Sequence, residues 1–194
     1  MRNKKQMNKL ALQTKLKRLL IAGGLAALVA VPLLLGNPGM RKVDAAQGDV
    51  KINSTNFPDE GFRKYISGNI DLNEDGVLSK SEIKSVKTIC LSYTSEEYGY
   101  TCKSLTGINI FTELQTLECA GNELTKLDVS KNSKLEYLSC RFNELTKLDV
   151  SKNTKLVKLD CDDNELTKLD VSKNTKLVEL DLSLIHISEP TRPY

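Results

Sequence analysis

The chain has 194 residues and a formal net charge of +3, with one histidine and no tryptophan. Its charge is unevenly distributed: residues 1–18 carry seven Lys or Arg and no acid, whereas residues 46–181 hold 18 Lys and Arg against 23 Asp and Glu. The basic balance therefore belongs to the N-terminus. In the remainder lysines alternate with acids, which excludes the basic stripe of a nucleic-acid-binding protein.

The N-terminal segment, residues 1–45, has the pattern of a secretory signal peptide. An almost unbroken apolar run from Leu19 to Leu35 follows the basic residues, and we predict cleavage after Ala45. The run is about long enough to span a bilayer, so an uncleaved anchor is the alternative, and any membrane contact would be through this segment. Both alternatives predict a secreted or cell-surface protein, in a compartment where disulfides persist.

Residues 46–88 contain a candidate metal-binding loop. The stretch from Asp71 to Glu82 reads DLNEDGVLSKSE and matches the spacing DxNxDGxxxxxE of the calcium-binding EF-hand loop. Ca²⁺ is a hard ion that takes six to eight oxygen ligands, and Gly76 permits the tight turn that gathers them. The predicted ligands are Asp71, Asn73, Asp75, Val77 (through its carbonyl), Ser79 and Glu82. Short helices should flank the loop; the alternative is a helix-loop-helix in which the acids only cap helix ends.

Residues 89–113 are predicted to form an irregular first repeat with a Tyr-rich insertion. Cys90 and Cys102 flank the insertion with eleven residues between them. We predict a disulfide between them that pins the insertion, the alternative being two free thiols.

Residues 114–182 are built from a repeat of 21 residues. The block NELTKLDVSKN occurs unchanged at residues 122–132, 143–153 and 164–174, and each unit has apolar positions spaced LxxLxCxxNxL. This spacing resembles the leucine-rich repeat, with cysteine in one leucine slot. The resemblance implies an α/β fold: a solenoid in which each unit adds one short strand to a curved parallel sheet. The inward cysteines Cys119, Cys140 and Cys161 are predicted to be small core residues, because stacked strands hold them too far apart for disulfides.

Variation among the repeats is confined to strand residues that should point away from the core. Solvated residues elsewhere, such as Lys126 and Asp128, are copied unchanged, so drift at exposed positions is the weaker explanation. We therefore predict a ligand-binding concave face, here called the variable face. It consists of Thr116, Glu118, Tyr137, Ser139, Arg141, Lys158, Asp160, Asp162, Glu179 and Asp181.

Two further resemblances concern the ends of the repeat array. The segment 46–88 is similar to the N-terminal cap of internalin-type bacterial surface proteins, in which an EF-hand-like helical unit covers the open end of the repeats. The repeats themselves resemble those of other secreted Gram-positive proteins. Residues 183–194 leave the repeat register, and LSLIHISEPTR resembles a translated sequencing adapter, so His186 is given no catalytic role.

These features predict an exported binding module for a protein or glycan partner, with a calcium-stabilised cap and a role in adhesion or surface interaction. The alternatives are a structural cell-wall spacer and the recognition part of a larger enzyme lost by truncation. Residues 46–181 contain no histidine, nucleophile elbow or phosphate loop, so we expect no enzymatic activity in this chain.

Overall fold

The computed structural model describes residues 48–92 and 101–182, which belong to one compact unit. The predicted signal peptide, most of the Tyr-rich insertion and the adapter-like tail with His186 lie outside the described residues. Within the described ranges, no helix is both long and apolar enough to cross a membrane.

A small helical unit precedes the repeats. It comprises strand β1 (Val50–Lys51), helix α2 (Glu60–Asn69), strand β2 (Val77–Leu78) and helix α3 (Lys80–Ser85). Strand β1 pairs antiparallel with β2, so the loop between the helices is held by a strand partner. Helix α2 begins after Asp59, whose side chain accepts the backbone N–H of Phe62 at 2.8 Å.

The helical unit is attached to the first repeat through α2 and its cap. The second carboxylate oxygen of Asp59 accepts the N–H groups of Lys103 at 2.9 Å and Ser104 at 3.3 Å. The Tyr65 hydroxyl accepts the N–H of Cys90 at 3.1 Å. Phe57 lies so close to Gly107, which has φ +103°, that a side chain at Gly107 would collide with the Phe57 ring. The end of the array next to the helical unit is therefore covered.

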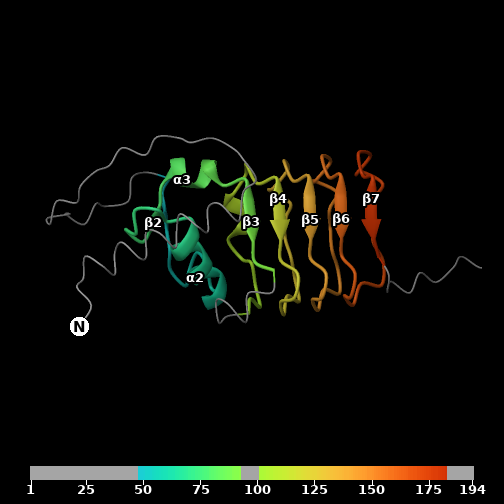
Figure 1. Cartoon of the computed structure of the whole chain (residues 1–194), viewed down its shortest axis with the longest axis horizontal. Helices are drawn as coiled ribbons and strands as arrows, with labels where there is room; N and C mark the ends of the chain where they lie inside the picture. The colour runs from blue at the N-terminus through green and yellow to red at the C-terminus, as the bar shows by residue number, and fades with distance from the viewer. Residues whose placement is uncertain (1–47, 93–100, 183–194) are drawn as a thin grey trace, which may run out of the picture. The chain divides into compact units, whose positions relative to one another are not determined.

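The repeats form one parallel sheet in the order β3-β4-β5-β6-β7 (Figure 1). The strands are β3 (Thr88–Cys90), β4 (Thr116–Glu118), β5 (Tyr137–Ser139), β6 (Lys158–Asp160) and β7 (Glu179–Asp181). Leu117 faces Leu138, which faces Leu159, so neighbouring strands are offset by one 21-residue unit. The predicted solenoid and its register are confirmed.

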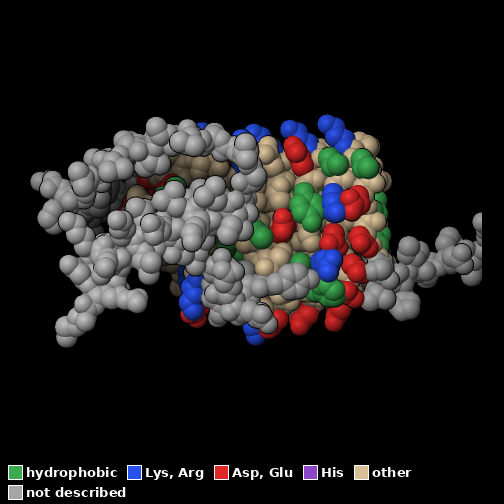
Figure 2. All heavy atoms as spheres, in the orientation of Figure 1, with side chains coloured by type: hydrophobic (Ala, Val, Ile, Leu, Met, Phe, Trp, Pro, Cys, Tyr) green, Lys and Arg blue, Asp and Glu red, His purple; other side chains and the backbone are tan. Residues whose placement is uncertain are grey.

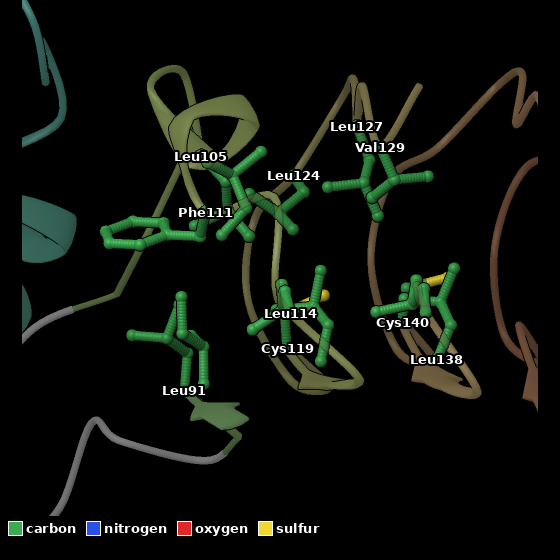
Figure 3. Packing of buried hydrophobic residues seen from close by; sticks show 14 of the residues in the cluster. Leu91, Leu105, Phe111, Leu114, Cys119, Leu124, Leu127, Val129, Leu138 and Cys140 are labelled. Atoms are coloured by element: carbon green, nitrogen blue, oxygen red, sulfur yellow. The ribbon is translucent and has the colours of Figure 1, made fainter. Parts of the chain in front are cut away.

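The core runs the length of the array between the sheet and the returning segments. Figure 3 shows Leu114, Cys119, Leu138 and Cys140 from the sheet side, together with Leu124, Leu127 and Val129 from the return. Residues of α2, including Phe62 and Ile66, belong to the same buried cluster. Cys119, Cys140 and Cys161 are at most 1% exposed, which confirms that they are core residues.

Two ladders of buried asparagines join consecutive repeats. Asn143 accepts the N–H of Leu124 at 3.0 Å and donates to the carbonyls of Cys119 and Cys140 at 2.9 and 3.0 Å. Asn122 and Asn164 make the equivalent bonds one unit away on either side. On the return, Asn132, Asn153 and Asn174 donate to carbonyls of the preceding unit. Because each amide completes turns that the backbone alone would leave unpaired, the copied asparagines are structural.

The first repeat is longer than the others, and its cysteines are not bridged. Thr88 pairs with Thr116, an offset of 28 residues instead of 21. Cys102 donates its N–H to Asn122 as Leu124 does to Asn143, so Cys102 occupies a buried leucine position. Cys90 lies on the opposite side of its strand, exposed beside Glu118. The predicted Cys90–Cys102 disulfide is wrong, because the two thiols point to opposite faces of the sheet.

Candidate functional site

The variable face consists of side chains in register across four strands. Leu117, Leu138 and Leu159 are fully buried at the centres of their strands, so their neighbours on either side point away from the core. One row contains Thr116, Tyr137, Lys158 and Glu179, and a second contains Glu118, Ser139, Asp160 and Asp181. Arg141 and Asp162 follow at the ends of β5 and β6. The structure thus brings the ten predicted residues together on one side of the sheet.

Two cations of this face each lie between an aromatic ring and a carboxylate. The Lys158 ammonium forms an ion pair with Glu179 and is 5.7 Å from the centre of the Tyr137 ring. The carboxylate of Glu179 raises the pKa of Lys158. The Arg141 guanidinium is 4.6 Å from the centre of the Phe142 ring and 3.9 Å from Asp160. These contacts run between adjacent repeats, so the face is preorganised across unit boundaries.

Asp160 is the most enclosed charged group of the face. It is 8% exposed, and one of its oxygens accepts the Ser139 hydroxyl at 3.1 Å. The other oxygen is buried and accepts no hydrogen bond within the structure, and the same holds for one oxygen of Asp162. Two acceptors with unused capacity therefore lie next to each other on β6 and the turn after it.

The sequence analysis missed residues at the edge of this face. Phe142 is 41% exposed, with φ +52°, and Asp163 occupies the equivalent position with φ +48°. Both correspond to Gly121, which has φ +66°. A glycine at one copy of this position signals a left-handed backbone, and a phenylalanine held there at a conformational cost could have been singled out on that basis. Cys90 was also missed: it pairs in register with Glu118 and extends the second row.

The loop predicted to bind calcium forms a tight turn ordered by its own side chains. Asp71 accepts the N–H of Gly76 at 3.0 Å, and Gly76 has φ +79°. Asn73 and Asp75 accept the N–H groups two residues further along, at 3.3 and 2.8 Å. Glu82 accepts the N–H groups of Leu72 and Ser79, and with Ser79 it forms the capping box of α3.

The fit of this loop to a metal ion is supported by its chemistry and by one orphaned atom. Asp71 is 3% exposed, and its Oδ1 is buried without a hydrogen-bond partner. The predicted ligands all offer oxygen, the donor that Ca²⁺ prefers. Across the part of the chain that the structure describes, however, no three Asp, Glu, His or Cys side chains are gathered closely enough to hold a metal ion. Ion binding would therefore require Glu82 to exchange hydrogen bonds of its capping box for the ion.

Comparison with known proteins identifies the type of solenoid. No protein-family profile matches the chain, and no curated protein does. Among solved structures, the functional domain of InlJ from Listeria monocytogenes, described as including a cysteine ladder, matches with a TM-score of 0.61 and 35% identity over 71% of this chain. An internalin, inlF, from the 4b F2365 strain of the same species matches with a TM-score of 0.57 and 26% identity over 71% of this chain.

The chain spans a minor part of those proteins, 29% of the first and 39% of the second. Its own stacked Cys119, Cys140 and Cys161 lie in a solenoid similar to one described by its cysteine ladder. The similarity extends to the 21-residue offset of the parallel strands only through the fold, so it carries the architecture and not a ligand. The described chain is a parallel-sheet, leucine-rich repeat solenoid that resembles the internalins of Listeria.

Proposed function

We propose that this protein is an exported binding module whose variable face contacts a protein partner. The observation that carries the proposal is the distribution of change among the repeats. Exposed return residues such as Lys126 and Lys147 are identical, whereas the rows on the sheet differ from unit to unit. Scaffold needs alone would allow both surfaces to be copied. Tyr and Arg, which are enriched in binding hot spots, occupy the middle of the varied surface.

The resemblance to internalins supports the same class of function, and it favours export through the signal segment and a location at the cell surface or outside the cell. A glycan partner and a role in adhesion remain part of the proposal. The structural spacer is the competing function, and it predicts no dependence on the variable face.

Binding to an array of extracellular proteins and glycans tests this proposal. We expect at least one protein spot that retains the wild-type chain and loses the variant Tyr137→Ala/Arg141→Ala, because truncation of two central anchors removes most of the contact. The matched control is Lys126→Ala/Lys147→Ala on the return segments, which should bind as the wild type does. Equal effects of the two variants, or no specific spot, would support the spacer.

We also propose that the loop from Asp71 to Glu82 binds one Ca²⁺ ion, held by Asp71, Asn73, Asp75, Val77, Ser79 and Glu82. The ion would supply positive charge to a loop rich in carboxylates and occupy the unused oxygen of Asp71. Because the helical unit covers one end of the core, binding should stabilise the whole unit by mass action, about 2.7 kcal/mol when the ion is at 100 times its Kd.

Calorimetric titration of the full chain with CaCl₂ measures this site directly. We expect one ion per chain, and a loss of at least about tenfold in affinity for Asp71→Asn and for Glu82→Gln. Glutamine preserves the capping box at Glu82, so the second variant separates ion binding from helix stability. Glu60→Gln, at an exposed position of α2, is the control. Absence of heat with the folded wild type would exclude the site.

A further inference from the structure

The end of the variable face over β6 and β7 carries an excess of negative charge. Four of its residues are acids, namely Asp160, Asp162, Glu179 and Asp181, and Asp163 lies in the adjoining turn. Figure 2 shows acidic side chains gathered at this end of the array, with a few basic and hydrophobic ones among them. Two cations, Lys158 and Arg141, offset part of the charge. We call these five acids the acidic patch; it retains an excess of three negative charges.

The acidic patch also has hydrogen-bonding capacity that the chain itself does not use. Asp160 is 8% exposed, yet its Oδ1 has no hydrogen-bond partner, and the Oδ1 of Asp162 is likewise buried and unpaired. Buried polar atoms are normally satisfied, and a buried carboxylate oxygen needs a donor. Both orphaned atoms are acceptors on one patch of one sign, so the complementary ligand carries donors and positive charge.

The aromatic residues at the border of the patch favour the same ligand. Tyr137 and Phe142 each already hold a cation of this chain over the ring, beside a carboxylate. This arrangement shows that rings and carboxylates are spaced to share one cationic group. A guanidinium suits such a site better than an ammonium, because it stacks on a ring while it donates in its plane to carboxylate oxygens.

We propose that the acidic patch binds an extended, arginine-bearing segment of a protein partner, with guanidinium groups donating to Asp160 and Asp162. This inference rests on the proposed function of the variable face and names the chemistry of its partner. Anionic glycans and acidic peptides are disfavoured because they would place like charges against unpaired carboxylates.

Fluorescence anisotropy with a labelled octapeptide that alternates Arg and Ser tests the inference on the full chain. Two matched peptides replace Arg by citrulline, which keeps the shape without the charge, and by Glu. We expect binding of the Arg peptide that weakens as salt is raised, and little binding of the other two. Asp162→Asn/Asp181→Asn should weaken binding by about tenfold or more. The control Asp149→Asn/Asp170→Asn makes the same charge change on the return segments and should leave the affinity unchanged.

The inference is overturned if the Arg peptide does not bind, if the citrulline peptide binds equally well, or if the control variant weakens binding as much as the patch variant. Circular dichroism of each variant checks that the solenoid is folded. Failure here is separate from failure of the proposed function. If the array shows binding that depends on Tyr137 and Arg141 while the Arg peptide does not bind, the variable face is a binding surface for another chemistry.

Discussion

The thiol groups of this protein differ sharply in their surroundings. Burial raises the pKa of Cys102 and of Cys161 to about 12, and raises those of Cys119 and Cys140 further. Cys90 is exposed, although burial of its thiol and the nearby Glu118 carboxylate also raise its pKa. Since the thiolate is the nucleophile, both access and ionisation favour Cys90 among the five.

Alkylation should therefore be selective for Cys90. We expect iodoacetamide at about pH 8 to label Cys90 in the folded protein and the other four thiols only after denaturation. Glu118→Gln should speed the labelling of Cys90, because it removes a neighbouring negative charge. Mass spectrometry of proteolytic peptides over time gives the rates. Labelling of Cys119 as fast as Cys90 would show that Cys119 does not point inward as in Figure 3.

At the scale of the element, the asparagine ladder holds each turn to its neighbour. Asn143 contributes one acceptor and one amide that donates to several carbonyls, all at 2.9–3.1 Å. Its replacement by alanine would leave these buried backbone groups unpaired. We expect Asn143→Ala to lower the free energy of unfolding by about 2–3 kcal/mol.

Urea denaturation measures this loss, with Glu144→Ala as the control. Glu144 is the exposed next residue of the same block, and its replacement should change stability by less than about 0.5 kcal/mol. A loss for Asn143→Ala no larger than that of the control would contradict the structural role of the ladder.

The repeat period predicted most of these elements, for a physical reason that also sets its limit. Identical spacing places Leu117, Leu138 and Leu159 at equivalent positions, so strands, core and outward rows all follow from one period. The period fails in the first repeat, where the 28-residue offset moves Cys102 into a leucine position and defeats the disulfide prediction. The pairing of β1 with β2 was not predicted, because strands of two residues have no recognisable pattern.

The candidate site was predicted in position but not in chemistry. Alternation along a strand identifies which side chains point outward, and this located the variable face. The stacking of Lys158 on Tyr137 depends on which rotamers adjacent repeats adopt, and the burial of Asp160 depends on the packing of Ser139 beside it. Neither property has a signal within one repeat.

Over the whole array, a column of aspartates on the return segments links stability to pH. The pKa values of Asp128, Asp149 and Asp170 are lowered by the backbone N–H groups of Ser130, Ser151 and Ser172, which donate at 2.8–2.9 Å. A carboxyl whose pKa is lower in the folded than in the unfolded state stabilises the fold above its unfolded pKa, and that contribution is lost as pH falls through the folded pKa.

The protein should therefore lose stability below about pH 4. The triple variant Asp128→Asn/Asp149→Asn/Asp170→Asn retains an acceptor for each serine N–H but cannot titrate, so its stability should fall less steeply with acid. Thermal denaturation between about pH 6 and pH 3 compares the two slopes. Parallel slopes for the variant and the wild type would show that other groups govern the acid response.

The copied block of eleven residues makes one whole unit exchangeable for another. Every ladder bond that Asn143 makes with the unit before it is repeated by Asn164 with the next, so a deletion or duplication of 21 residues recreates the same contacts at the new junction. The length of the array can change by whole units without a redesign of its interior. Each such event also adds or removes one row of the outward surface, so a gene of this type can vary its recognition surface by recombination as well as by point mutation.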